Sequence, residues 1–102
     1  MKKAEVIPLE ISAAIARPII REIAADTSRI VILDHAKRRM RKRRITPSQV
    51  YSCLRKGIIA EGPALDDKGF WRCTMRRLAA GEEITVVVSF NSRDRVLVIT
   101  AY

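Results

Sequence analysis

The amino-acid sequence predicts an α+β domain of two layers, in which N-terminal helices pack on a four-stranded antiparallel sheet. Two observations lead to this fold class. Apolar residues recur at helical spacing in the first part of the chain, and their period changes to two after Gly57. Turn signals at residues 66–69, 80–82 and 91–94 then separate segments of strand length. The 102 residues are enough for one compact domain.

Isoleucines at every fourth position predict the first helix, over residues 7–25. Pro8 and Glu10 are typical of a helix start. Pro18 lies inside the segment, where its missing N–H group and its ring predict a kink or a split near Arg17. The isoleucines form an apolar stripe along this helix, which consists of Ile7, Ile11, Ile15, Ile19 and Ile23. Another surface must cover the stripe: the protein's own sheet, a second copy of the chain or a partner.

An extended run at Ile30–Leu33 precedes a second predicted helix over residues 35–44. Asp34 is predicted as the N-cap of this helix, because its carboxylate accepts backbone N–H groups and faces the positive end of the helix. One face is mostly apolar, and the neighbouring face is basic, at spacings of three and four residues. The first face holds Ala36, Met40 and Arg43, and the second holds His35, Arg38, Arg39 and Lys42.

A third helix is predicted to begin at Thr46, which can cap it, with Pro47 in the first helical position. Gln49 completes a capping box, and Gly57 is a natural stop. The expected buried residues are Val50, Tyr51, Cys53 and Leu54.

The second part of the chain predicts four strands joined as an antiparallel meander. In the second of them, Trp71, Cys73 and Met75 point to one face, and Arg72, Thr74 and Arg76 point to the other. The expected strands are Ile58–Glu61, Phe70–Leu78, Ile84–Phe90 and Val96–Tyr102. We therefore expect one domain over residues 1–102, with residues 1–28 as a helical extension and residues 29–102 as the core.

The positive charge of the chain is concentrated in one segment. The net charge is +9, and residues 29–56 hold ten basic groups against Asp34 alone, which accounts for the whole excess. From Lys37 to Arg44, seven of eight residues are Lys or Arg. Such a block repels itself unless a polyanion lies nearby, and this favours nucleic acid as the partner over an ordinary solvated helix face.

Other classes of protein fit the sequence less well. It has no apolar run long enough to span a bilayer and no secretory signal pattern at Met1, so we expect a cytoplasmic protein without a membrane partner. Cys53 and Cys73 lack metal-ligand spacing and are expected to be reduced core residues. No metal site and no cofactor motif is visible.

His35 followed by arginines is the constellation best suited to chemistry. Metal-independent RNA cleavage needs a base for the 2′-hydroxyl, an acid for the leaving 5′-oxygen, and cations for the charged phosphorane. Histidine serves either proton role, and arginine binds phosphate oxygens in a fork. The candidate catalytic residues are His35, Arg39, Arg72, Arg76 and Tyr102, and the candidate RNA-backbone contacts are Arg38, Arg41, Lys42, Arg43 and Arg44.

Simpler roles are open for the same residues. A histidine at a helix start is commonly a surface or capping residue. Arg72 and Arg76 can be the wet face of a half-exposed sheet. Tyr102 can cover the edge of the core or present its ring to a base.

Three stretches carry a resemblance to a known family: HAKRRMRKRRITPSQVYSCLRKGIIAEGP, GFWRCTMRRLAAGEEITVVVSF and RVLVITAY. From about Ile30 to Tyr102 the chain resembles the bacterial family called domain of unknown function 4258. That family is similar to the ribonuclease toxins of RelE and BrnT type. The resemblance implies helices packed on a four-stranded antiparallel sheet, a metal-independent mRNA-cleaving toxin or an inactive relative, and a cognate antitoxin. It also implies that His35 and the sheet arginines form the site.

Two further functions stay open. Residues 35–56 form two helices joined by a short turn, as in a non-enzymatic nucleic-acid-binding module, although the charge lies on the first helix and the second normally reads the groove. The isoleucine stripe instead favours a protein-interaction domain that forms a homodimer or binds an antitoxin.

Overall fold

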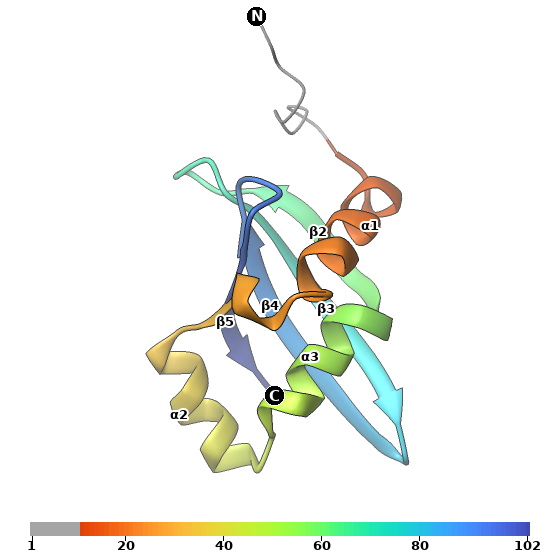
Figure 1. The fold of residues 1–102 in the computed structure, drawn as a ribbon, viewed down its shortest axis with the longest axis vertical. Coiled ribbons are helices and arrows are strands. Elements are labelled where there is room, and N and C mark those ends of the chain that lie inside the picture. Colours follow the sequence, from red (N-terminus) through yellow and green to blue (C-terminus); the bar gives the residue numbers. More distant parts are fainter. Residues whose placement is uncertain (1–10) are drawn as a thin grey trace, which may run out of the picture.

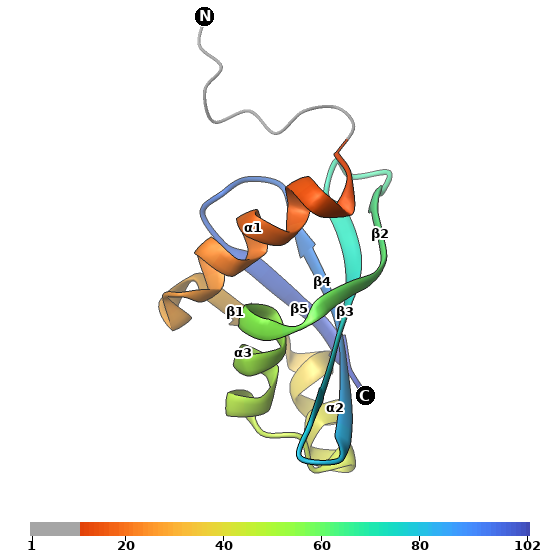
Figure 2. The same cartoon turned by 90° about the vertical axis from the view of Figure 1, so that its right-hand side faces the viewer.

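The computed structural model describes residues 11–102, in which helices α1 and α3 lie on one side of a five-stranded sheet and α2 lies beside strand β5 (Figures 1 and 2). The α+β class is as predicted. The elements are α1 (Ala13–Ala24), a 3-10 turn η1 (Thr27–Arg29), β1 (Ile30–Ile32), α2 (Asp34–Arg43), α3 (Pro47–Lys56), β2 (Ile58–Leu65), β3 (Trp71–Ala79), β4 (Glu82–Phe90) and β5 (Val96–Ala101).

The sheet is mixed, and the prediction of four antiparallel strands is wrong in this respect. Its strand order is β1-β5-β4-β3-β2, and β1 pairs with β5 in parallel, with Ile30 opposite Val96 and Ile32 opposite Val98. The extended run was recognised, but its partner lies more than sixty residues away. A local pattern does not reveal such a long-range pairing.

The antiparallel meander from β2 to β5 is confirmed, with β4 in a central position. Ala80 and Gly81 connect β3 to β4 with φ angles of 54° and 79°, which is the two-residue turn that suits the twist of a hairpin. Strand β2 extends beyond the predicted end at Glu61, because two register shifts let its pairing with β3 continue to Leu65.

Helix α1 is continuous through Pro18, so of the two predicted alternatives near Arg17, a kink or a split, the split is wrong and the kink stays a prediction. The helix begins after Ser12, whose hydroxyl accepts a hydrogen bond from the N–H of Ile15. The predicted start at residues 7–10 lies outside the described residues. Pro18 removes one backbone donor, but Ile19, on its C-terminal side, is buried. The tertiary packing of the helix therefore offsets the proline.

The apolar face of α1 is covered by the protein itself. A spacing of four residues drifts around a helix of 3.6 residues per turn, and Ile15 consequently leaves the core and is 45% exposed. The face that packs against α3 and β2 contains Ala16, Ile19, Ile20, Ile23 and Ala24.

The predicted N-cap of α2 is shifted by one residue. Leu33 occupies the cap without a side-chain hydrogen bond, and Asp34 is the first helical residue. The reason is that Leu33 still belongs to the extended run, since its N–H donates to the carbonyl of Val98. Asp34 keeps its favourable place in the first turn.

The predicted boundaries of α3 are confirmed. Thr46 and Gln49 form the complete capping box, and Pro47 opens the helix. Gly57 ends it with extended backbone, and a Cβ atom there would lie 2.5 Å from the carbonyl oxygen of Cys53. The same Cβ atom would lie 2.7 Å from the carbonyl oxygen of Arg76, so the end of α3 and the adjacent strand β3 together require glycine here.

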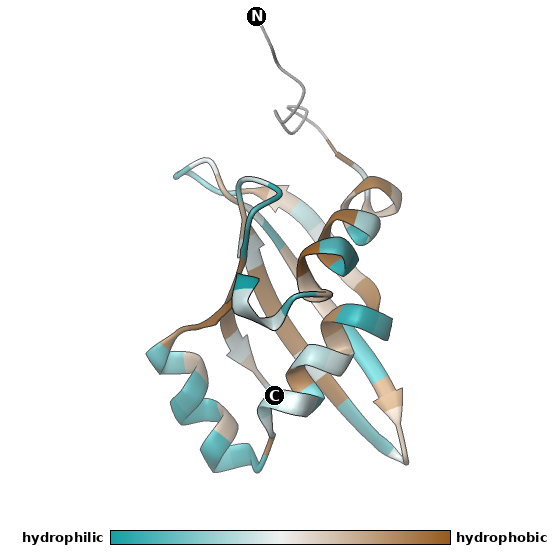
Figure 3. Ribbon diagram, in the orientation of Figure 1, coloured by the Kyte–Doolittle hydropathy of each residue, from teal (hydrophilic) through white to brown (hydrophobic). Residues whose placement is uncertain are grey.

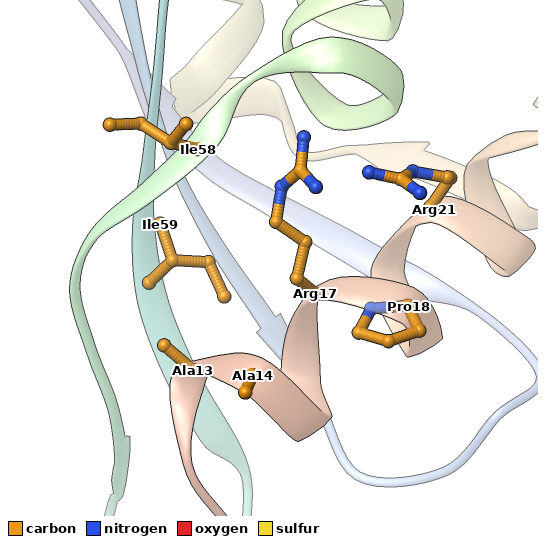
Figure 4. Close-up of a pocket in the computed structure, with 7 residues that line it drawn as sticks. All are labelled: Ala13, Ala14, Arg17, Pro18, Arg21, Ile58 and Ile59. Carbon is orange, nitrogen blue, oxygen red and sulfur yellow. The ribbon is translucent and has the colours of Figure 1, made fainter.

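Two arginines join α1 and α3, because each donates hydrogen bonds to backbone carbonyls at the C-terminal end of the other helix. The guanidinium of Arg17 donates to the carbonyl of Gly57 at 2.6 Å and to that of Lys56 at 3.4 Å. Arg55 donates to the carbonyl of Ala24 at 2.7 Å. Carbonyls at a helix C-terminus lack intrahelical partners and carry partial negative charge, so each arginine satisfies the end of the opposite helix. Figure 4 shows Arg17 extending from α1 toward α3, beside a hollow bounded by Ile58.

Replacing Arg17 by alanine should lower the free energy of unfolding by about 1.5–3 kcal/mol, because the change removes charge-assisted bonds to the end of α3. Arg21→Ala is the matched control, since the exposed side chain of Arg21 forms no hydrogen bond within the described residues and its loss should change stability by less than about 0.5 kcal/mol. Urea unfolding of both variants measures this. Equal losses would contradict the structural role of Arg17.

The core contains both cysteines as free, buried residues, as predicted. Burial raises the pKa of the Cys53 thiol to about 11 and that of Cys73 to about 12. The folded protein therefore keeps both thiols protonated at pH values where the unfolded chain begins to ionise them.

We expect both thiols to resist alkylation at pH 8 until the protein unfolds, since thiolate is the reactive form and burial suppresses it. Because the unfolded thiols ionise first, stability should also fall as pH rises above the ordinary value of 9.0. Mass spectrometry after timed alkylation, with and without urea, tests the first point. Rapid labelling of the native protein would contradict it.

Candidate nucleic-acid interface

Helix α2 is held to the body of the protein by a narrow apolar face. Ala36 and Met40 are buried against the core, and their side of the helix contacts β5. Figure 3 shows the rest of α2 as strongly hydrophilic. Among residues 11–102, seven cations of α2 and its C-cap form neither a hydrogen bond nor an ion pair through their side chains. They are Lys37, Arg38, Arg39, Arg41, Lys42, Arg43 and Arg44.

Three arginines outside α2 hold parts of the fold together. Arg29 donates to the backbone carbonyls of Asp94 and Arg93 and thereby ties η1 to the β4–β5 connection. Arg17 and Arg55 join α1 to α3. The seven cations of α2 and its C-cap make no such contacts within residues 11–102, so their charge does not serve the fold in this way.

His35 lies exposed in the first turn of α2. Arg38 and Lys42 follow at three and seven residues, so they lie along the same side of the helix. Arg39 is half-buried, and its Nε atom is buried without a hydrogen-bond partner. The imidazole and at least two cations are therefore presented together to solvent.

Arg72 and Arg76 lie on the face of β3 opposite the core, as the alternation predicted, and both are exposed. Arg76 forms an ion pair with Glu83 at 3.0 Å, whereas Arg72 forms none within the described residues. Strands β5 and β4 lie between α2 and β3. Two strand spacings, about 10 Å, separate β3 from the strand that α2 contacts. Arg72 and Arg76 also project from the face opposite the core, whereas α2 is attached through the core residues Ala36 and Met40, so the structure does not place His35 beside these arginines.

Tyr102 lies at the end of β5 and is associated with a different group of cations. Its N–H and C=O exchange hydrogen bonds with Thr85, and Thr85 in turn lies opposite Arg76. Tyr102 also lines a hollow of about 450 Å³ that we call the corner hollow. In both cartoon views the C-terminus, the α2–α3 connection and the β3–β4 hairpin lie at one end of the molecule (Figures 1 and 2). The hollow is lined by Arg43, Arg44, Ile45, Glu82, Glu83, Ile84 and Tyr102.

The acidic side chains of the corner hollow were not predicted as site residues. Glu82 and Glu83 follow the β3–β4 turn, and their local sequence indicates only a hairpin. Their position beside Arg43 and Arg44 results from tertiary packing.

The two carboxyl groups with shifted pKa values, Asp26 and Asp66, lie in turns and not at this interface. Hydrogen bonds from the backbone N–H groups of Phe70 and Lys68 lower the pKa of Asp66. Hydrogen bonds from Ser28 lower the pKa of Asp26.

Within residues 11–102, no three His, Cys, Asp or Glu side chains gather as a metal site. In the same range, none of the helices is both long enough and apolar enough to cross a bilayer.

The family model described as Domain of unknown function (DUF4258) matches residues 32–102, and the chain belongs to that family. The match confirms that part of the predicted resemblance, while the relation to RelE-type and BrnT-type toxins stays a prediction. No curated protein and no solved structure matches the chain. Helix α1 lies outside the matched residues, although its side chains belong to the core.

Arg44 has a strained backbone conformation. It ends α2 in the left-handed region, at φ 59°, where glycine is the usual residue. An L-residue in this conformation costs about 1–2 kcal/mol, so an arginine here favours a role for its side chain.

We expect Arg44→Gly to raise the free energy of unfolding by about 1 kcal/mol, because it removes this strain. Arg43→Gly removes the same charge one residue earlier but should destabilise by about 1 kcal/mol, since Arg43 is helical. Thermal and urea unfolding of the pair measure the difference. Destabilisation by both would show that Arg44 is not strained.

Proposed function

We propose that the protein is a toxin-like endoribonuclease that binds single-stranded RNA along α2 and cleaves it without a metal ion. The seven α2 cations, which have no partner among the described residues, carry this proposal. A ten-residue helix is about 15 Å long, so these charges can face several consecutive phosphates. Neutralisation by a polyanion would relieve their mutual repulsion and release counterions from the nucleic acid.

Exposure and placement support His35 as the group that transfers protons. In the proposed reaction, His35 transfers one of the two protons, by taking the proton of the 2′-hydroxyl or by supplying the proton to the leaving 5′-oxygen, and solvent water transfers the other. The 2′-oxygen forms a bond to phosphorus, the bond from phosphorus to the 5′-oxygen breaks, and the products are a 2′,3′-cyclic phosphate and a 5′-hydroxyl. Arg38 and Arg39 would stabilise the charge that develops on the phosphate.

The roles of the remaining candidates follow their positions. Arg41, Lys42, Arg43 and Arg44 would bind the RNA backbone along α2 and at its end. Tyr102 would contact a nucleotide next to the cleaved bond. Arg76 is already paired with Glu83, which leaves Arg72 as the sheet arginine better able to approach phosphate. An acidic antitoxin that covers these cations belongs to the same proposal.

Binding without cleavage is the second candidate, favoured by the two strand spacings between α2 and the sheet arginines. The two functions differ in whether they require His35. A nuclease needs His35, whereas a binding module needs the cations alone.

We expect the purified protein to cleave single-stranded RNA in EDTA, and His35→Ala to lower the cleavage rate at least about 100-fold while changing RNA affinity less than about twofold. Arg38→Ala should weaken binding, and Arg95→Ala, which removes an exposed cation from another part of the surface, should not. Gel analysis of end-labelled RNA and fluorescence anisotropy give the two quantities. Tight binding with no cleavage by the wild type would leave the binding module, and cleavage that requires added magnesium would refute the mechanism.

A further inference from the structure

The corner hollow combines groups that a phosphate alone does not explain. Its lining includes two arginines, the half-exposed Tyr102, and Glu82 and Glu83, which are successive residues of β4 and direct their carboxylates to opposite faces of the sheet. Its volume of about 450 Å³ is within the range of small-ligand sites. Carboxylates repel phosphate, and they accept hydrogen bonds from N–H groups. Their presence beside a helix that is otherwise basic indicates a ligand with both an anionic part and a donor edge.

Glu82 is the carboxylate that is fixed in place and has acceptor capacity left. One of its oxygens accepts a hydrogen bond from the Nε2 of Gln49 at 3.1 Å. Gln49 is itself held by the capping box of α3, since its Oε1 accepts from the N–H of Thr46 at 2.8 Å. An ionised carboxylate has about four acceptor positions, so this bond leaves most of them free. Glu83 is instead neutralised by Arg76.

The chemistry of the four bases distinguishes among them at such a group. Guanine carries two adjacent donors on its Watson–Crick edge, N1–H and N2–H, which match the two oxygens of a carboxylate. Adenine places the acceptor N1 beside its amino group, and uracil and cytosine also place acceptors beside their single donor group, which a carboxylate repels. The aromatic ring of Tyr102 offers a surface on which a base can stack.

We propose that the corner hollow binds a guanine nucleotide of single-stranded RNA, with Glu82 accepting from its base, Tyr102 stacking on it and Arg43 and Arg44 binding its phosphate. This inference rests on the proposed RNA binding and adds base specificity to it. The strained conformation of Arg44 supports the assignment, because glycine would end the helix at lower cost but would lose the guanidinium.

The test compares oligoadenylates in which one central base is guanine, inosine or adenine, in buffer with EDTA and with 2′-O-methyl sugars that prevent cleavage. Fluorescence anisotropy should show the guanine oligomer bound about tenfold more tightly than the adenine oligomer. Inosine, which lacks the N2 amino group, should lie between them. Equal affinities for the three would overturn the guanine site and leave RNA binding intact, whereas absence of binding to all of them would overturn RNA binding as well.

Glu82→Gln separates recognition from folding. The glutamine side-chain oxygen can still accept from Gln49, so the fold should be retained, but its NH₂ group opposes the donors of guanine. We expect the preference for guanine to disappear while affinity for the adenine oligomer stays the same or rises. Glu61→Gln is the matched control, since it removes an equal charge from β2 and should keep the preference. A preference that survives Glu82→Gln would overturn the proposed role of Glu82.

Discussion

Mutual repulsion among seven cations on and next to one ten-residue helix is the constraint on which the account of this protein depends. Like charges three and four residues apart destabilise a helix. The protein offsets this cost with the burial of Ala36 and Met40 and with a carboxylate in the first turn, at Asp34. Within residues 11–102, none of these cations forms an ion pair with an acidic side chain, although Glu82 and Glu83 lie beside Arg43 and Arg44. A helix kept in this state is suited to a polyanion.

The rest of the fold supplies the stability that such a helix lacks. Helices α1 and α3 cover the sheet and are joined by Arg17, which bonds to the C-terminal end of α3, and by Arg55, which bonds to the last residue of α1. Their buried residues supply most of the helical contribution to the core, so α2 can be attached by a narrow face. The family match begins at Ile32 and excludes α1, yet Ile20 and Ile23 are fully buried in the common core. In this chain the first helix is thus a structural part of the domain.

Local sequence patterns predicted those features that local energetics decide. The capping box at Thr46, the stop at Gly57 and the face of the sheet that Arg72 and Arg76 occupy were all readable from spacing and residue type. Long-range packing decided the others. It pairs β1 with β5, keeps α1 continuous through Pro18, and moves the cap of α2 from Asp34 to Leu33. None of these follows from neighbours in the sequence.

The candidate site divides in the same way. The basic helix and its histidine were evident from composition, whereas Glu82 enters the corner hollow because a hairpin, a helix end and the last strand meet there. The separation between α2 and the sheet arginines was also invisible in the sequence, and it leaves α2, which was already predicted to contact the RNA backbone, as the proposed centre of RNA contact.

The salt dependence of RNA affinity tests the central claim most directly. If five to seven cations of α2 contact phosphates, a plot of log K against log salt for single-stranded RNA should have a slope of about −3.5 to −5. Replacing Arg38, Arg41 and Lys42 by serine should reduce that slope by about 2. A wild-type slope shallower than about −1, or one unchanged in the triple variant, would contradict the claim that α2 binds the RNA backbone.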